Sequence, residues 1–179
     1  ELFKLVKNSN SNALKVLFKK YYQNLCYFSI SYVKEKQIAE EVVADIFINL
    51  WEKRSKLNIT AKVKPYLYTS VRNQSLNYIR SNKLHAEKLD AVDEITLTMI
   101  NGPDDNLHYN DLKTLIDKLI DTLPEKRKLI FQMNRFDELS YDEIAEILSI
   151  SGSTVRNQMV KAIQQMNSSY PMLRKFYPS

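Results

Sequence analysis

Apolar residues recur every three or four positions through most of the chain, a spacing that places them on one face of an α-helix. The pattern predicts helices near residues 13–33, 37–53, 65–81, 111–122, 124–135, 140–148 and 153–167. After the third of these, the segment LDAVDEITLTMINGPDDNLHYND breaks the periodicity with Gly102, Pro103 and a run of acids. We therefore expect an all-α chain in which two small helical domains, residues 1–88 and 111–179, are joined by a flexible acidic linker, residues 89–110.

Composition agrees with this expectation. The 179 residues are 44% hydrophobic, enough for one or two small cores, and include only two glycines and five prolines. No apolar run approaches the roughly 20 residues of a membrane-spanning helix, so we expect no stable membrane insertion. The single cysteine, Cys26, cannot form a disulfide within the chain, which fits a reducing cytoplasm.

Charge is distributed unevenly, although the net charge is only +5. Residues 53–88 contain nine Lys or Arg and one acid, residues 89–111 contain six acids and no base, and residues 151–179 contain four bases and no acid. Two basic zones on either side of an acidic one indicate two separate anionic contacts, and nucleic acid is the commonest long anion in a cytoplasm. Chance clustering of surface charge is the alternative.

The last two predicted helices form a helix-turn-helix. Ser140 followed by Glu143 is a capping box that begins the first helix, and the small Ala145 lets a second helix approach closely. A short turn, SIS, ends at Ser151, and the second helix follows it. This combination is typical of DNA-binding domains, in which the second helix enters the major groove. A plain antiparallel helix pair is the alternative.

The second of these helices has one apolar and one polar face. At about 100° per residue, its buried side consists of Val155, Met159, Ala162, Ile163 and Met166. The outer side carries hydroxyls, amides and cations but no carboxylate, so it can read base edges and reach phosphates. The predicted DNA contacts are Ser151, Ser153, Thr154, Arg156, Asn157, Gln158 and Lys161.

The helix predicted over 65–81 is also two-faced. Its core side holds Leu67, Tyr68, Val71, Ser75, Tyr78 and Ile79. The opposite side carries a stripe formed by Tyr66, Ser70, Asn73, Asn77 and Arg80. Beside the basic loop KRSKLNITAKVK, this stripe suits single-stranded DNA, because bases stack on rings and cations follow the backbone. For any single tyrosine, packing in the core is the simpler interpretation. The predicted single-strand contacts are Arg54, Lys56, Asn58, Lys62, Lys64, Tyr66, Arg72, Asn73, Asn77 and Arg80.

The helix IAEEVVADIFINLWE has an excess of apolar residues. They spread over about 200° of arc, whereas one core needs little more than about 100°. Core packing explains Phe47 and Trp51 as well as a partner contact does. Ile48, by contrast, is surrounded by carboxylates, as expected for an apolar protein-docking spot with a polar rim. These carboxylates belong to Glu41, Asp45 and Glu52.

Together these segments resemble the sigma factors of bacterial RNA polymerase, specifically the compact two-domain extracytoplasmic-function (ECF) group. AEEVVADIFINLWE is similar to that family's polymerase-binding segment. PYLYTSVRNQSLNYIR is similar to its segment that melts and holds the −10 promoter element, and LPEKRKLIFQMNRFDELSYDEIAEILSISGSTVRNQMVKA to its −35 reader. The resemblance covers residues 13 to about 167, and the three segments occur in the family's order.

The resemblance implies roles for particular residues. The segment that docks on the clamp helices of the polymerase includes Glu41, Asp45, Phe47, Ile48, Leu50 and Trp51. The loop over 54–64 corresponds to the place where the family captures flipped-out −10 bases. The positions beside the melted strand are Arg72, Asn73, Asn77 and Arg80. The positions on the −35 helix are Ser153, Thr154, Arg156, Asn157 and Lys161.

Three positions depart from the family's usual residues. Ala44 stands where Gln is common, Asn77 where Asp is common, and Glu138 where a Gly often precedes the final two helices. Ala44 slightly weakens the assignment of this helix to polymerase docking, and Glu138 affects only a turn. The −35 helix is also less basic than in many members.

The function implied by the resemblance is that of an ECF sigma factor, which directs core RNA polymerase to promoters by reading the −35 element and melting the −10 element. The implied partners are core RNA polymerase, promoter DNA in double- and single-stranded form, and an anti-sigma factor. The implied location is the cytoplasm, and the resemblance implies no catalytic activity, cofactor or metal.

Two other classes of protein are alternatives. A stand-alone helix-turn-helix regulator would bind duplex DNA without polymerase. An enzyme acting on nucleic acid has little support, because His85, His108 and Cys26 lack metal-ligand spacing and the chain has no Gly-rich phosphate loop.

Overall fold

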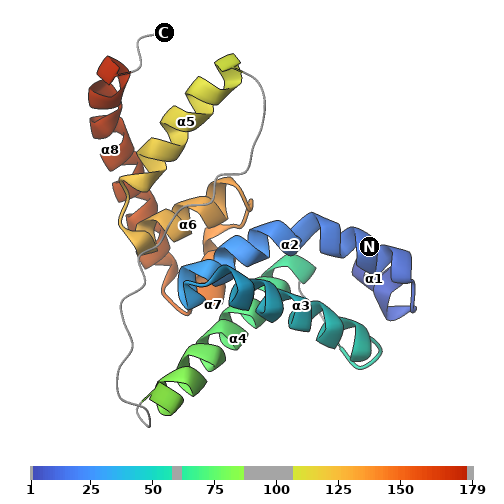
Figure 1. Cartoon of the computed structure of the whole chain (residues 1–179). Coiled ribbons are helices and arrows are strands. Elements are labelled where there is room, and N and C mark those ends of the chain that lie inside the picture. Colours follow the sequence, from blue (N-terminus) through green and yellow to red (C-terminus); the bar gives the residue numbers. More distant parts are fainter. Residues whose placement is uncertain (1, 58–61, 87–106, 177–179) are drawn as a thin grey trace. The chain divides into compact units, whose positions relative to one another are not determined.

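The computed structural model describes residues 2–57, 62–86 and 107–176, and these ranges contain eight helices and no strand (Figure 1). The all-α prediction is therefore confirmed. The chain divides into two compact units, Glu1–Ile95 (unit 1) and Thr96–Ser179 (unit 2). Each unit has its own core, and each is described below by itself.

Unit 1 contains α1 (Leu2–Lys7), α2 (Ser11–Val33), α3 (Lys36–Glu52) and α4 (Val63–Ala86). The last three helices agree with the predicted ones, although α4 runs five residues further than expected. The periodicity did not predict α1, because a helix of six residues with one fully buried side chain, Val6, shows no repeating pattern.

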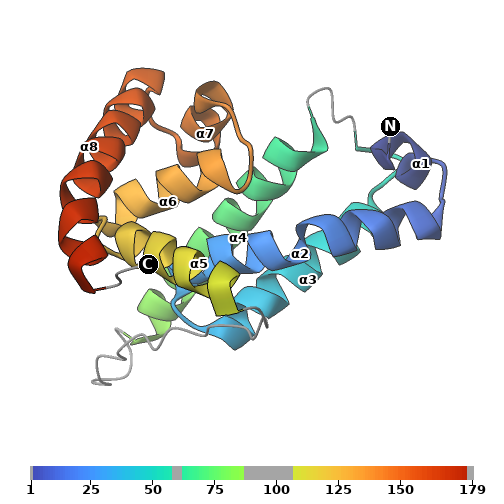
Figure 2. The same ribbon diagram turned by 90° about the horizontal axis from the view of Figure 1, so that it is seen from above.

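The long helix α2 packs along both α3 and α4 and forms the centre of unit 1 (Figures 1 and 2). Ring contacts join it to each neighbour. The Phe18 and Phe47 rings meet edge to face with centroids 5.0 Å apart, and the Phe28 and Tyr68 rings lie at the same distance. Such aromatic pairs add stabilisation beyond the apolar area that they bury. Because α3 and α4 are each anchored to α2, their outward faces are fixed as well.

One buried polar contact lies within this apolar core. The hydroxyls of Ser29 on α2 and Ser75 on α4 are 2.9 Å apart, and both residues are completely buried. Each hydroxyl therefore provides a hydrogen-bond partner for the other in a place without access to water.

Unit 2 contains α5 (Leu107–Asp121), α6 (Glu125–Arg135), α7 (Tyr141–Leu148) and α8 (Gly152–Phe176). The predicted linker over 89–110 lies largely outside the described residues, and α5 begins within its last four positions. The helices α6, α7 and α8 pack against one another, and α5 packs against α8. Their shared core includes Ile130, Met133, Ile144, Ile147, Val155 and Met159.

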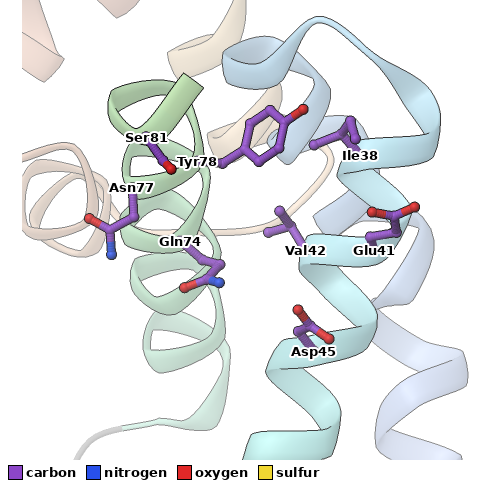
Figure 3. Close-up of a pocket in the computed structure, with 8 residues that line it drawn as sticks. All are labelled: Ile38, Glu41, Val42, Asp45, Gln74, Asn77, Tyr78 and Ser81. Carbon is purple, nitrogen blue, oxygen red and sulfur yellow. The ribbon is translucent and has the colours of Figure 1, made fainter. Parts of the chain in front are cut away.

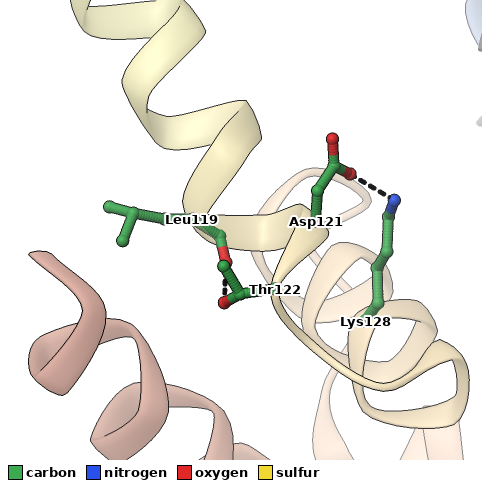
Figure 4. Close-up of polar contacts among 4 residues, drawn as sticks. All are labelled: Leu119, Asp121, Thr122 and Lys128. Atoms are coloured by element: carbon green, nitrogen blue, oxygen red, sulfur yellow. Dashed lines mark hydrogen bonds and ion pairs between the residues drawn. The ribbon is translucent and has the colours of Figure 1, made fainter. Parts of the chain in front are cut away.

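The turns of unit 2 are fixed by hydrogen bonds. Between α5 and α6, the Thr122 hydroxyl donates to the Leu119 carbonyl at 2.7 Å, and Lys128 forms an ion pair with Asp121 (Figure 4). The predicted capping box at Ser140 is confirmed. Its hydroxyl accepts from the Glu143 N–H at 3.2 Å, and its own N–H donates to the Glu143 carboxylate at 2.8 Å.

Among the described residues of unit 2, two adopt the left-handed backbone conformation that favours glycine. Glu138 precedes α7 with φ 52°, and Ser149 ends α7 with φ 54°. Glu138 is the position where the ECF family often has glycine, so the family's preference has a backbone cause. An L-residue with a β-carbon is strained there by roughly 1–2 kcal/mol.

Two further findings concern the described residues. None of their helices is both long enough and apolar enough to cross a membrane. Within the same ranges, no three His, Cys, Asp or Glu side chains come together in a way that could hold a metal ion.

We predict that Ser29→Ala and Ser75→Ala each lower the free energy of unfolding by about 1–3 kcal/mol, because each leaves one buried hydroxyl without its partner. The double variant should lose less than the sum of the two single changes. Urea unfolding followed by circular dichroism measures this, with Ser70→Ala on the outer side of α4 as the control. Strictly additive losses would contradict the prediction.

We predict that Glu138→Gly stabilises unit 2 by up to about 1 kcal/mol, because glycine relieves the left-handed strain by more than its extra unfolded-state entropy costs. The matched control is Glu146→Gly in the middle of α7, which should destabilise by about 1 kcal/mol. Thermal unfolding reports both as shifts of a few degrees in opposite directions. A fall in melting temperature for Glu138→Gly would show that the turn is not strained.

Candidate nucleic-acid and polymerase interfaces

The outer face of α8 carries most of the predicted −35 contacts. Val155, Met159 and Ala162 are buried against the rest of unit 2, and they fix which side of the helix points outward. The predicted contacts that are exposed on the other side are Ser153, Thr154, Arg156, Asn157 and Lys161. Ile163 was predicted to be buried but is 40% exposed, because it lies at the edge of the narrow apolar arc.

Ser151 lies immediately before α8 and caps its first turn. Its hydroxyl accepts a hydrogen bond from the Thr154 backbone N–H at 3.1 Å, which is an N-cap interaction. The same oxygen lies 2.9 Å from the Ser153 hydroxyl and 2.7 Å from the Thr154 hydroxyl. Three hydroxyl groups thus gather at the exposed start of the helix.

Gln158 does not belong to the outer face. Its side chain is partly buried and accepts a hydrogen bond from Arg127 Nε of α6 at 3.2 Å. Arg127 also donates through Nη1 to Gln165 at 2.6 Å, and Gln165 donates in turn to the Thr122 carbonyl. Gln158 therefore connects α8 to α6. The helical wheel could not show this because it contains no information about neighbouring helices.

The stripe on α4 is arranged as predicted. Asn73, Asn77 and Arg80 are exposed, and Tyr66 and Ser70 are partly exposed. Among the residues predicted to face the core, Tyr78 and Ile79 are partly exposed, whereas Leu67, Tyr68, Val71 and Ser75 are buried. In the basic loop, Lys56 and Lys62 are exposed, and Asn58 lies outside the described residues.

Arg54 and Arg72, both predicted single-strand contacts, interact with other side chains of unit 1. Arg54 lies over the Trp51 ring, 4.2 Å from its centroid, and donates to the Trp51 carbonyl at 2.6 Å and to the Ser9 hydroxyl at 3.0 Å. It therefore ties the end of α3 to the α1–α2 turn. Arg72 lies beside the Tyr32 hydroxyl. Burial raises the pKa of Tyr32, and the Arg72 charge partly offsets this effect.

On α3, the structure separates the predicted polymerase contacts into two groups. Ile48 is 55% exposed, Glu41 and Asp45 are exposed beside it, and Trp51 is partly exposed. Phe47 and Leu50 are only 4% and 1% exposed. They belong to the core, so they support α3 from within and cannot touch a partner while unit 1 stays folded.

A groove between α3 and α4 joins the two predicted surfaces. Glu41 and Asp45 of α3 and Gln74 and Asn77 of α4 all line it (Figure 3). The acidic face and the amide stripe are therefore adjacent. Asn77 is the position where the ECF family often has Asp, so this chain has one carboxylate fewer beside Glu41 and Asp45.

The sequence patterns did not identify one cluster near the start of α4. The Tyr21 ring on α2 has Lys20 Nζ 5.5 Å and Lys64 Nζ 6.0 Å from its centroid. Tyr21 and Lys64 are far apart in sequence, so a helical wheel for either helix alone does not bring them together.

Comparisons with known proteins agree with this geometry. Family models match residues 17–85 as "Sigma-70 region 2" and residues 113–166 as "Sigma-70, region 4". The ECF RNA polymerase sigma factor SigM of Bacillus subtilis (strain 168) is 24% identical over 158 residues, which cover 86% of this chain and 93% of SigM. The ECF RNA polymerase sigma-E factor of Escherichia coli (strain K12) is 22% identical over 183 residues, covering 97% of this chain and 95% of that protein.

The chain belongs to the ECF group of the sigma-70 family. It is a sigma factor that directs RNA polymerase to promoters, and it binds core polymerase and promoter DNA. The protein class is that of transcription initiation factors rather than catalysts.

Two solved structures share the fold of this sigma factor. The sigma factor RpoE in complex with the anti-sigma factor NepR from Bartonella quintana has a TM-score of 0.63 and 19% identity, covering 86% of this chain and 94% of RpoE. CnrH in complex with the cytosolic domain of CnrY has a TM-score of 0.57 and 14% identity, covering 93% of each chain. The region 2 match spans α3 and most of α4, and the region 4 match spans the helix-turn-helix.

The single cysteine of the sigma factor is not a reactive group. Burial raises the pKa of the Cys26 thiol to about 11, and burial also raises the pKa of Tyr22, which hydrogen-bonds to it. At neutral pH the thiol is protonated and therefore a poor nucleophile. Cys26 behaves as a small apolar core residue, as a lone cysteine on an apolar helix face usually does.

We predict that Arg127→Met destabilises unit 2 by about 1–2 kcal/mol, because it removes the two hydrogen bonds that hold α8 on α6 while keeping most of the apolar stem. Arg135→Met at the exposed end of α6 is the matched control and should change stability by less than about 0.5 kcal/mol. Urea unfolding measures both. Equal stability of the two variants would contradict the role assigned to Arg127.

Proposed function

We propose that this sigma factor carries out initiation with three exposed helix faces, one on each of α3, α4 and α8. The observation that carries the proposal is shared by all three helices. On each, most of the predicted contact residues stand on the solvent side, while the opposite side fills a core; the exceptions are Phe47 and Leu50 on α3 and Gln158 on α8. In this proposal residues 1–88 act as region 2, residues 111–179 act as region 4, and residues 89–110 are the linker between them.

The α3 face docks on core polymerase. Ile48 is an exposed apolar side chain. The carboxylates of Glu41 and Asp45 form a polar rim beside it, and Trp51 lies at one end of this surface. An apolar centre within a polar rim is the usual anatomy of a protein–protein contact. The Phe47 and Leu50 side chains are left out of this surface because they are buried.

The α4 face holds the melted −10 strand. Tyr66 offers a ring on which a base can stack, Asn73 and Asn77 offer amides to base edges, and Arg80 offers a cation to phosphate. Lys56, Lys62 and Lys64 extend the cationic path into the loop before α4. Opening the duplex then uses binding energy, because each unstacked base is held once it leaves the helix.

The α8 face reads the −35 element in the major groove. Ser153, Thr154 and Asn157 supply short polar groups to base edges, and Arg156 and Lys161 reach guanine or phosphate. The Ser151 hydroxyl acts mainly through its cap of α8, and Gln158 acts through its bond to Arg127.

Weak contacts by two tethered units add up once both sit on one polymerase, because the second contact becomes intramolecular. This explains why neither DNA-binding face needs a large positive charge. The complex of RpoE with the anti-sigma factor NepR supports an anti-sigma factor as a further partner of this chain. The proposed location is the cytoplasm, where polymerase and promoter meet.

We predict that Ile48→Asp weakens binding to core RNA polymerase at least tenfold, because it replaces the apolar centre of the docking spot with a further carboxylate. Val16→Asp is the matched control, since Val16 lies on α2 and is 50% exposed, and it should leave the affinity within about twofold. Fluorescence anisotropy of the labelled full chain with core enzyme measures both. Unchanged binding by Ile48→Asp would remove the α3 face from the interface.

A further inference from the structure

A row of three side chains runs along the end of α3 and finishes in an arginine. Ile48, Trp51 and Arg54 follow one another at a spacing of three residues, which makes them neighbours on one side of the helix and its last turn. Ile48 is exposed, and Trp51 and Arg54 are partly exposed. Arg54 therefore lies beside the surface proposed to dock on polymerase, although the sequence pattern assigned it to single-stranded DNA.

Three contacts hold the Arg54 guanidinium in place. Its carbon Cζ lies 4.2 Å from the centroid of the Trp51 ring, and its Nη1 donates to the Trp51 carbonyl at 2.6 Å. Its Nε donates to the Ser9 hydroxyl at 3.0 Å. A cation over an indole ring is attracted to the face of the ring, and a planar guanidinium stacks on it. Because the hydrogen bonds fix the guanidinium, the ring that it covers is restrained as well.

Ser9 belongs to a turn that is itself well fixed. It has a left-handed backbone with φ 62°, its N–H donates to the Val6 carbonyl at 2.9 Å, and the Asn10 N–H donates to the Leu5 carbonyl at 3.0 Å. This pair of hydrogen bonds closes α1 as a Schellman motif. The Asn10 side chain then accepts from the Ala13 N–H at 3.0 Å and caps α2. The Ser9 hydroxyl is therefore a firm anchor for the guanidinium.

A tryptophan that is held in place before binding contributes more affinity than one that is free to turn. Ordering a side chain at an interface costs free energy, and a side chain already ordered in the free protein avoids most of that cost. Tryptophan is also one of the residue types that most often dominate the binding energy of an interface. The contacts of Arg54 thus bear on how well Trp51 can bind a partner.

We propose that Arg54 is a positioning residue for polymerase docking, which holds the Trp51 ring in its binding orientation and is itself anchored by Ser9. This inference rests on the proposed docking role of the α3 face. It gives α1 a part in that role, because the turn that carries Ser9 closes α1. It also removes Arg54 from the single-strand contacts.

The test is the affinity of the labelled full chain for core RNA polymerase, measured by fluorescence anisotropy. Arg54→Gln should weaken binding about three- to tenfold, the cost of ordering one side chain on binding, and Ser9→Ala should weaken it less. Lys53→Gln is the matched control, because it removes the same charge from the neighbouring position and should leave the affinity within about twofold. In a chain that carries Trp51→Leu, Arg54→Gln should cause no further loss, because no ring remains to be positioned.

Two further measurements do not require polymerase. Trp51 is the single tryptophan of the chain, so quenching of tryptophan fluorescence by acrylamide reports on this ring alone. Arg54→Gln should make the fluorescence easier to quench, whereas Lys53→Gln should not. In binding of a labelled oligothymidine over a series of salt concentrations, Arg54→Gln should leave the slope of log affinity against log salt unchanged, whereas loss of a phosphate contact would reduce it by about 0.7.

The outcomes separate this inference from the proposed function. If Ile48→Asp weakens polymerase binding while Arg54→Gln behaves like Lys53→Gln, the positioning role is overturned and the α3 face stands. If Arg54→Gln weakens binding equally with and without Trp51→Leu, Arg54 does not act through the ring and the role is wrong. A reduced salt slope would overturn the role as well and return Arg54 to the single-strand contacts. If neither Ile48→Asp nor Arg54→Gln changes the affinity, the docking face and the positioning role are both overturned.

Discussion

Burial of a single apolar stripe on each helix is the constraint on which the whole arrangement depends. A helix that packs one side into a core can rotate very little about its own axis, so the residues on its other side are fixed as well. Val155, Met159 and Ala162 set α8 in this way, and Leu67 and Val71 set α4. The contact faces of this sigma factor are therefore consequences of core packing. Substitutions that loosen the packing of a core should therefore weaken the binding of DNA or polymerase even when no contact residue is replaced.

Much of this could be read from the sequence, because periodicity reports directly on which side of a helix is apolar. It placed every described helix except α1, together with the capping box at Ser140, the exposed Ile48 and the α4 stripe. Periodicity did not predict the features that depend on packing against a second helix. The helix that carries Phe47 and Leu50 is apolar over a wide arc, and only packing of α2 on α3 shows that both are buried. Periodicity could not predict the hydrogen bond between Gln158 and Arg127 for the same reason, since Arg127 is on another helix.

Electrostatics gives unit 1 two different surfaces on one small scaffold. Among the described residues of unit 1, the acids lie on α3 or just before it, whereas α2 and α4 carry seven bases and no acid. One side suits a protein partner and the other suits nucleic acid, and the groove lined by Asp45 and Asn77 is where they adjoin. A chain with a net charge of only +5 can thus keep acidic and basic side chains on different helices of one small unit.

The central claim is that these faces act together on one polymerase at one promoter. It is tested most directly by transcription from fragments of the organism's own genome, using core RNA polymerase with and without this protein. The account predicts discrete transcripts that start at defined positions only when the protein is present. An absence of transcripts, together with tight and specific duplex binding by the protein alone, would contradict it and indicate a stand-alone DNA-binding regulator.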